Sequence, residues 1–600
     1  MMDGPSARTG TVSRAALRPD PGRHPAREAA PRRPRRARCA PVATLRDALL
    51  DRAARAPDAA AFYLFDLEDR LATLTCGELL TLATRVAGGL RERDLAPGDR
   101  VLLCFDTAAE LLAAFFGCVV AGAVPALVEP PSLQGRAAGW RATLEERRRL
   151  LGARALLLDD RLKPQVPEDG ECRGLTVLGP ADFPPRADPL PAAATNPRSP
   201  AFLQFTSGTT KQARAVMVHH GPLFSNARSI AEVSAWSEDD LVVSWLPLHH
   251  DMGLAGLTIA PFLHGLPVAL LPPLAFILRP SRWLWALHYF RGTVSGGPNF
   301  AYHLLATRTT PAELAGLDLR SWRLAYNGAE MIQPATLRRF QERFGPHGFG
   351  AGCMVPVYGM SEMVVAATFP VHGVRPRLDT IDREILAAEG RAVPVAETSP
   401  RALTLVGVGP PLPGHEIAIV DAAGSALPER HQGQVRLRGP SVTAGYFDAP
   451  ESTARVFGGG WLATGDLGYL ADGELFVCGR EKDLIIRAGC NYHPHSFEAA
   501  AASVPGVRAG GVAAFGAADG ATGSEEVVIV FETDLAGDEG RRQLCRQVEA
   551  AVFDQLAIRP ARVIPVPPRT LPKTSSGKLA RAAVRRCYQG GALDPPPGEP

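Results

Sequence analysis

Several features that would place a chain of 600 residues in a common class are missing from this sequence. Its ten cysteines include no C-x-x-C pair, so neither a zinc site nor a disulfide framework is indicated. We expect these thiols to be buried or idle in a reducing compartment. The pattern G-x-x-x-x-G-K-[ST] is also absent, which excludes a Walker-type phosphate loop.

An apolar signal region is missing as well. Residues 1–42 carry ten arginines against three acidic residues and show no apolar periodicity. We expect a disordered extension or a start codon placed too early, with an organelle transit peptide as the weaker alternative. The rest of the chain has 55 basic and 59 acidic side chains. Such a nearly neutral body argues against nucleic acid as the main partner.

No apolar run is convincing as a membrane span. The 18 residues of Leu111–Val128 contain no charge, which reaches the lower limit for a transmembrane helix. Gly117, Gly122 and Pro125 interrupt the run, so it is better explained as a buried helix followed by a buried strand. We therefore expect a soluble, cytoplasmic protein without a membrane span.

What the sequence does contain is an alternation of helices and short apolar strands. Leucine and valine recur at helical spacing over residues 79–90, a strand follows at Val101–Phe105, and a helix over about 108–121 leads into Val124–Val128. This order predicts an α/β fold with a parallel sheet, in layered subdomains. Beyond residue 400 the pattern becomes β-rich, and the last hundred residues form a small α+β unit. A chain of this length needs two or more domains.

One turn is unusually rich in hydroxyl groups. A strand ending at Phe205 runs into Thr206–Thr210, which holds four hydroxyl side chains around Gly208. Glycine lets the backbone turn, and successive N–H groups together with hydroxyl donors suit phosphate oxygens. An ordinary Ser/Thr-rich surface turn remains an equal alternative for this stretch alone.

Two histidines and an aspartate follow in the stretch Trp245–Leu254. His249, His250 and Asp251 stand between apolar flanks and have the side chains of metal ligands. Because no further spaced ligand lies nearby in the sequence, we favour a polar rim on an apolar pocket, with a satisfied loop as the alternative.

Two more strands end in chemically rich loops. Leu324–Glu330 is a strand that ends in a glycine turn, and Met354–Val357 delivers Tyr358–Glu362 at its carboxyl end. Ligands of open α/β sheets gather at such ends. The second loop offers the aromatic face of Tyr358 for stacking and a glycine, Gly359, at which a ligand can come close to the backbone. It also offers a hydroxyl as a phosphate donor and a carboxylate for Mg²⁺.

Two further residues lie in polar turns near the end of the chain. Asp466 is expected in a glycine-flanked turn between strands, where it accepts hydrogen bonds from a ribose or forms a simple Asx turn. Lys578 follows a flexible polar loop, from which it reaches an anionic substrate or stays solvated.

Taken together, the order and spacing of these five motifs resemble the adenylate-forming superfamily over roughly residues 45–585. The resemblance implies that MgATP is bound and that Thr206–Thr210 cradle its phosphates. Asn327–Ala329 and Tyr358 would frame the adenine, Ser361 would contact phosphate, and Asp466 and Arg480 would hold the ribose. Lys482 would be the hinge. The expected catalytic residues are Lys578, Glu362 and His250; the expected metal ligands are Glu362 and Thr206; and the expected nucleotide-binding residues are Thr206, Ser207, Gly208, Thr209, Thr210, Lys211, Asn327, Gly328, Ala329, Tyr358, Gly359, Met360, Ser361, Asp466 and Arg480.

Within the superfamily the chain is most similar to fatty acyl-AMP ligases. The residues that carry this similarity are Ser244–Gly253, Asn327–Glu330 and an insertion over about 371–402, expected as a polar loop with a short helix at Asp382–Ala388. The turn departs from the superfamily pattern because Lys211 and Ala213 replace glycine and proline, and Arg214 replaces lysine. We expect this change to affect the rate more than the reaction.

The similarity implies a reaction and a domain plan. A fatty acid and ATP would give acyl-AMP and pyrophosphate, and the acyl group would pass to a separate acyl carrier protein or polyketide or peptide synthase. Two rivals are an acyl-CoA synthetase that uses free CoA and, less favoured, a non-catalytic adenylate-binding protein. We expect an AMP-binding domain at 43–481, a mobile lid domain at 482–586 and a disordered tail at 587–600.

Overall fold

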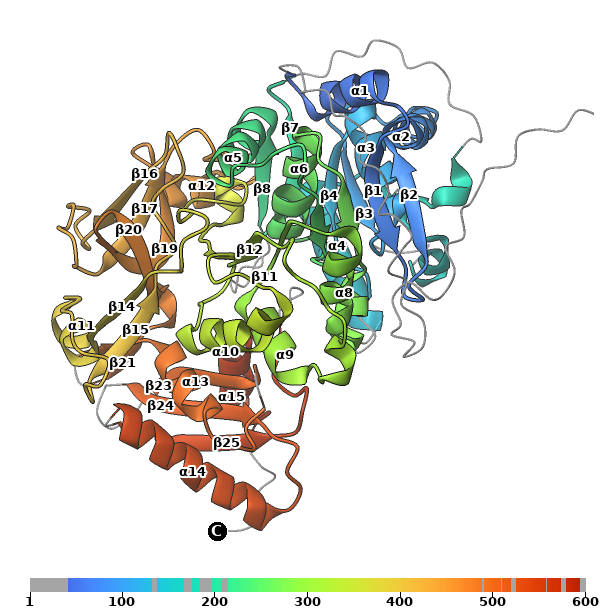
Figure 1. Cartoon of the computed structure of the whole chain (residues 1–600). Helices are drawn as coiled ribbons and strands as arrows, with labels where there is room; N and C mark the ends of the chain where they lie inside the picture. Colours follow the sequence, from blue (N-terminus) through green and yellow to red (C-terminus); the bar gives the residue numbers. More distant parts are fainter. Residues whose placement is uncertain are drawn as a thin grey trace, which may run out of the picture.

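The computed structural model describes residues 42–131, 137–166, 175–183, 197–206, 214–487, 490–508, 510–518, 525–556, 558–573 and 579–593. Figure 1 shows two packed α/β regions, a β-rich region beside them and a small unit at the carboxyl end. The α/β fold predicted from the alternating pattern is confirmed. Within the described ranges, no helix is both long and apolar enough to cross a bilayer.

The first large sheet has seven described strands in the order β13-β12-β11-β9-β10-β1-β2. All neighbours are parallel except β1 and β2, which form an antiparallel pair. The carboxyl ends of the parallel strands therefore lie on one edge. The strands are β1 (Ala60–Phe65), β2 (Leu71–Thr75), β9 (Val242–Ser244), β10 (Val268–Leu270), β11 (Val294–Gly297), β12 (Leu324–Asn327) and β13 (Met354–Pro356).

The second large sheet has six described strands in the order β6-β5-β3-β4-β7-β8. Its strands are parallel except for the β7–β8 hairpin. The strand predicted before the hydroxyl-rich turn is thus β7, and the turn connects it to β8. The strands are β3 (Arg100–Cys104), β4 (Val124–Leu127), β5 (Ala155–Leu158), β6 (Thr176–Leu178), β7 (Pro200–Phe205) and β8 (Ala215–His219).

Helices cover both sheets, and their ends follow local sequence signals. Thr75 and Glu78 form a capping box at the start of α2, and Gly122 in the left-handed conformation ends α3. The run Leu111–Val128 is therefore α3 and β4, as predicted. The helices are α1 (Leu45–Arg55), α2 (Cys76–Arg91), α3 (Ala109–Ala121), α4 (Ala137–Leu151), α5 (His220–Val233), α6 (Ala260–Leu263), α7 (Pro273–Leu278), α8 (Ser281–Phe290), α9 (Asn299–Arg308) and α10 (Pro334–Phe344).

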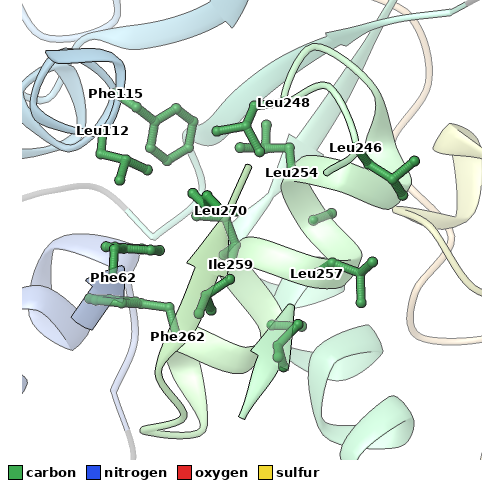
Figure 2. Packing of buried hydrophobic residues seen from close by; sticks show 14 of the residues in the cluster. Phe62, Leu112, Phe115, Leu246, Leu248, Leu254, Leu257, Ile259, Phe262 and Leu270 are labelled. Atoms are coloured by element: carbon green, nitrogen blue, oxygen red, sulfur yellow. The ribbon is translucent and has the colours of Figure 1, made fainter. Parts of the chain in front are cut away.

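One continuous apolar core joins the two sheets. The π-helix η4 (Met252–Ile259) is buried along its whole length and packs with α3 and strands of the first sheet. Figure 2 shows this packing. The labelled side chains are Phe62, Leu112, Phe115, Leu246, Leu248, Leu254, Leu257, Ile259, Phe262 and Leu270. Because η4 follows the His-His-Asp stretch directly, this core fixes where those polar residues lie.

The β-rich region contains the insertion. The predicted short helix is α11 (Arg383–Glu389), capped by Asp382 and ended by Gly390. An antiparallel pair, β14 with β15, flanks the helix, so the polar loop predicted before it contains a strand. The other elements are β14 (Leu378–Asp382), β15 (Ala402–Val406), β16 (Glu416–Val420), β17 (Gly433–Arg438), α12 (Pro450–Val456), β18 (Phe457–Gly458), β19 (Trp461–Ala471) and β20 (Glu474–Arg480).

The carboxyl-terminal unit is a three-stranded sheet, β23-β24-β25, with α13 and α14 on one face and α15 on the other. The last described helix continues past residue 586, and Leu593 is buried in the same cluster, so ordered chain extends beyond the expected boundary. The elements are β21 (Ile485–Arg487), β22 (Cys490–Tyr492), α13 (Pro494–Ala502), β23 (Val512–Ala518), β24 (Glu525–Glu532), α14 (Asp538–Leu556), β25 (Arg562–Val566) and α15 (Arg581–Gln589).

Candidate active site

The loops that follow β12 and β13 lie side by side at the carboxyl edge of the first sheet. Asn327 pairs with Pro356 in register, and the Val357 amide donates a hydrogen bond of 2.8 Å to the Asn327 carbonyl. The Asn327 side chain is fully buried, yet neither its Oδ1 nor its Nδ2 has a partner in the described part of the chain. A carboxamide can pair with the edge of adenine, so this unsatisfied group fits a nucleotide base.

Two glycines allow these loops to approach their neighbours closely. A Cβ on Gly328 would lie 2.7 Å from the Val357 carbonyl oxygen, and one on Gly359 would lie 1.8 Å from the Val365 carbonyl oxygen. Neither space admits a side chain. Ala329 is held in the left-handed region with φ of 68°. The close contact at Gly359 is with protein backbone, so the approach of a ligand predicted there stays a prediction.

A second group of side chains connects the β13 loop to the β-rich region. The Tyr358 hydroxyl donates to Asp466 Oδ2 at 2.7 Å, and Arg480 Nε lies 3.2 Å from Asp466 Oδ1. The Asp466 carboxylate raises the pKa of the Arg480 guanidinium. The predicted turn at Asp466 was wrong. Asp466 lies within β19, whose register with β17 and β20 shifts around it, and it pairs there with Arg480.

The His-His-Asp stretch lies against the Ser361 loop. The Ser361 hydroxyl donates to Asp251 Oδ2 at 2.5 Å, and His250 Nδ1 lies 2.9 Å from Asp251 Oδ1. Burial, together with the neighbouring His250, lowers the pKa of His249 to about 4. His250 and Asp251 thus join the same site as Ser361, which fits the predicted polar rim. Met360 precedes Ser361 as the residue that starts this short helical turn.

Glu362 is buried at the centre of the site. Its Oε1 accepts a hydrogen bond of 2.6 Å from the Tyr446 hydroxyl. Burial raises the pKa of this carboxyl, and the negative charge of Asp251 adds to the effect. A buried carboxylate with one fixed oxygen is suited to hold a cation. Sequence reasoning missed Tyr446, because nothing near it in the chain signals a contact with a residue 84 positions away.

Part of the predicted site falls outside the described residues. This applies to Ser207, Gly208, Thr209, Thr210 and Lys211, and to Lys578. The ends of the turn are described: the Thr206 amide donates to the Arg214 carbonyl at 3.0 Å, which closes the hairpin. Gln204 Nε2 donates to the His249 carbonyl at 2.7 Å. The turn therefore starts next to the His-His-Asp stretch.

A comparison with known families decides what this arrangement is. The sequence profile of the AMP-binding enzyme family matches residues 49–447. The chain belongs to this family. It is an enzyme of the ligase class, and the resemblance to adenylate-forming ligases found in the sequence is confirmed.

Within the AMP-binding family, the chain is similar to several individual proteins named as ligases or synthetases of fatty acids or acyl groups. The chain is 31% identical over 568 residues to the medium-chain-fatty-acid–[acyl-carrier-protein] ligase JamA of Moorena producens, covering 89% of this chain and 92% of JamA. It is 37% identical over 501 residues to a Caulobacter vibrioides protein provisionally named an acyl-CoA synthetase, covering 82% and 86% of the two chains. A structure from a study of fatty acyl-adenylate ligases of E. coli and L. pneumophila superposes with a TM-score of 0.85 at 34% identity, covering 92% of this chain and 98% of that one.

Proposed function

We propose that this AMP-binding enzyme activates a fatty or related carboxylic acid in the cytoplasm. The carboxylate attacks the α-phosphorus of MgATP, which gives acyl-AMP and releases pyrophosphate. The acyl group then passes to the phosphopantetheine thiol of a separate acyl carrier protein or synthase in lipid, polyketide or lipopeptide biosynthesis. The names of JamA and of the E. coli and L. pneumophila ligases support both the acid and the adenylate.

The arrangement of charge supports the first step. Carboxylate and ATP are both anions, so the site must supply positive charge where the bond forms. Mg²⁺ held at Glu362 and Thr206 would neutralise phosphate oxygens. Arg480, which pairs with Asp466, would hold the ribose, and the unsatisfied side-chain amide of Asn327 would contact the base. Lys578 and the amides of residues 206–210 would complete the phosphate contacts.

The contact between the insertion and the lid favours a carrier protein over free CoA. Helix α11 packs against β22 of the lid, and Figure 1 shows α11 beside β21. The main-chain N–H of Gln432 donates to the Gly390 carbonyl at the end of α11. Its side-chain Oε1 lies 3.1 Å from Nε2 of His493 in the lid. The similarity to fatty acyl-AMP ligases implies that the insertion opposes the arrangement that accepts free CoA, and its contacts with the lid support that role.

Free CoA is the second candidate acceptor, because the Caulobacter relative is named for it. Mass spectrometry of the products from purified protein, MgATP, a fatty-acid panel and CoA separates the two. We expect acyl-AMP to accumulate without acyl-CoA, and acyl transfer to begin when a phosphopantetheinylated carrier protein is added. Efficient formation of acyl-CoA would overturn the choice of carrier protein.

Lys578 offers a direct test of adenylation. Lys578→Ala should slow ATP–pyrophosphate exchange by about 10²- to 10³-fold, which is typical for the loss of one preorganised donor to developing charge. The thermal midpoint should stay unchanged. A normal exchange rate would remove Lys578 from the mechanism, whereas no exchange by the wild-type protein with any acid would favour a non-catalytic adenylate-binding protein.

A further inference from the structure

The hydrogen bond between Tyr446 and Glu362 connects two parts of the site that are far apart in the sequence. Both side chains are buried, and the Tyr446 ring packs edge-on against Phe457 with centroids 5.7 Å apart. The Tyr446 hydroxyl points at Glu362 Oε1 over 2.6 Å. Oxygen pairs at this distance are strong when the acceptor is ionised.

The backbone around Tyr446 is tied to the base of the phosphate turn. The Phe447 amide donates to the Ala215 carbonyl at 2.8 Å, and the Met217 amide donates to the Gly445 carbonyl at 3.0 Å. Residues 445–447 thus lie along β8, where Tyr446 forms an isolated antiparallel bridge with Val216. The Thr443 amide also donates to the Glu362 carbonyl at 2.9 Å. The position of Tyr446 is therefore set from both sides.

Arg214 completes the arrangement. It is the first described residue after the phosphate turn, and its guanidinium carbon lies 5.1 Å from the centroid of the Tyr446 ring. An arginine above a tyrosine ring is attracted by the face of the ring, and its charge polarises the hydroxyl. A polarised hydroxyl is a stronger donor, so the effect of Arg214 is passed on to Glu362.

We propose that Tyr446 is a positioning residue that holds the Glu362 carboxylate in the orientation needed by the cation of MgATP, and that Arg214 couples this hydroxyl to the phosphate turn. The inference rests on the proposed function, in which Glu362 holds Mg²⁺. Tyr446 touches neither nucleotide nor cation in this scheme. It acts through the carboxylate, as partners of metal ligands commonly do, and the loss of such partners typically weakens metal affinity by about 10- to 100-fold.

The chain contains a matched control for this hydrogen bond. The hydroxyl of Tyr469 donates to Asp379 Oδ2 at 2.7 Å, and Arg430 Nη1 lies 3.0 Å from the same oxygen. Tyr469 is also buried, but it packs in the cluster beside the insertion. Tyr446→Phe and Tyr469→Phe therefore remove the same kind of contact, and only the first is expected to change cation binding.

The experiment measures binding of Mn²⁺ to the protein saturated with a non-hydrolysable ATP analogue, from the free Mn²⁺ signal in electron paramagnetic resonance. Tyr446→Phe should raise the dissociation constant for Mn²⁺ by about 10-fold or more, and Tyr469→Phe should leave it within about twofold of wild type. Arg214→Ala should weaken binding less than Tyr446→Phe. It should add nothing in the Tyr446→Phe background, because both act on one carboxylate.

Glu362→Gln separates failure of this inference from failure of the proposed function. If Glu362→Gln abolishes Mn²⁺ binding while Tyr446→Phe and Arg214→Ala both behave like Tyr469→Phe, the positioning role is refuted and the metal site stands. If Glu362→Gln binds Mn²⁺ normally, the metal role of Glu362 is wrong and the inference falls with it. If Tyr446→Phe does not fold, an Arg214→Ala variant with a Mn²⁺ dissociation constant within about twofold of wild type would refute the coupling of Arg214 to Glu362.

Discussion

The Tyr358 hydroxyl donates a hydrogen bond of 2.7 Å to Asp466 Oδ2, although 108 residues separate the two. Tyr358 follows β13 of the parallel sheet, and Asp466 lies in β19 of the β-rich region. Arg480 occupies the other carboxylate oxygen at 3.2 Å. One buried carboxylate therefore joins the aromatic face expected at the base to the arginine expected at the ribose.

The first prediction concerns this carboxylate. Asp466→Asn should lower kcat/KM for ATP by about 10- to 100-fold, because a hydrogen bond to a charged group typically contributes about 1.5–3 kcal/mol. ATP–pyrophosphate exchange at varied ATP measures the effect. KM for the acid should change little. Tyr358→Phe is the milder control, since it keeps the ring and leaves Asp466 its arginine, and an equal or larger loss in this variant would contradict the prediction.

The second prediction follows from the raised pKa of Glu362. A carboxylate must be ionised to hold a cation, so Mg²⁺ affinity is complete above the raised pKa and is lost as pH falls through it. Stability runs the other way, because a raised carboxyl pKa in the folded state favours folding at lower pH. Titration of Mn²⁺ against the nucleotide complex at several pH values should show the loss beginning above pH 4.5, the ordinary value. A wild-type Mn²⁺ affinity that stays constant to below pH 4.5 would refute the prediction.

The parts of the site that the sequence could predict are those set by local pattern. The short apolar strands ending at Asn327 and before Tyr358 placed their loops correctly, because parallel strands bring their carboxyl ends to one edge. The helix in the insertion was found within one residue, since Asp382 and Gly390 are recognisable ends.

The parts that could not be predicted depend on tertiary contacts. The pairs Ser361–Asp251 and Tyr446–Glu362 join segments more than 80 residues apart, and no local pattern encodes such distances. The glycines around Asp466 suggested a turn, whereas the long strand β19 accommodates Gly465 at φ of 71° and shifts its register nearby. Glycine in a strand and glycine in a turn give the same local signal.

The third prediction tests the close approach at Gly359. A Cβ there would lie 1.8 Å from a backbone oxygen that cannot move away as a side chain can. Gly359→Ala should therefore destabilise the protein by about 1–3 kcal/mol or more and reduce activity through the displaced Tyr358 loop. Gly221→Ala is the matched control, because Gly221 lies in α5 with open space around it and alanine is favoured in a helix by about 0.5–1 kcal/mol. Chemical denaturation measures both, and a stable Gly359→Ala variant would refute the prediction.

The fourth prediction concerns the docking of the lid. His493 Nε2 lies 3.1 Å from Gln432 Oε1, and its ring stacks on that of His495 at 5.5 Å. Burial lowers the pKa of each histidine to about 3, with the neighbouring His495 adding to the effect on His493 and Arg581 of α15 adding to that on His495. An undocked lid would expose the ring of His493, whose ordinary pKa lies near 6.5.

Because the pKa of the histidine is lowered in the docked lid, only the undocked lid takes up a proton below pH 6.5. The stability of the docked lid is therefore complete above pH 6.5 and is lost as pH falls. His493 should reduce the stability of the docked lid by about 1.4 kcal/mol for each pH unit below 6.5. Hydrogen exchange of residues 485–502 should therefore accelerate between pH 7.5 and 5.5, after correction for the intrinsic pH dependence of exchange. A His493→Asn, His495→Gln double variant should lose this acceleration, whereas Gln432→Ala should raise exchange at pH 7.5 and keep it. Equal pH dependence in the wild type and the double variant would show that groups other than these histidines set the pH dependence of lid docking.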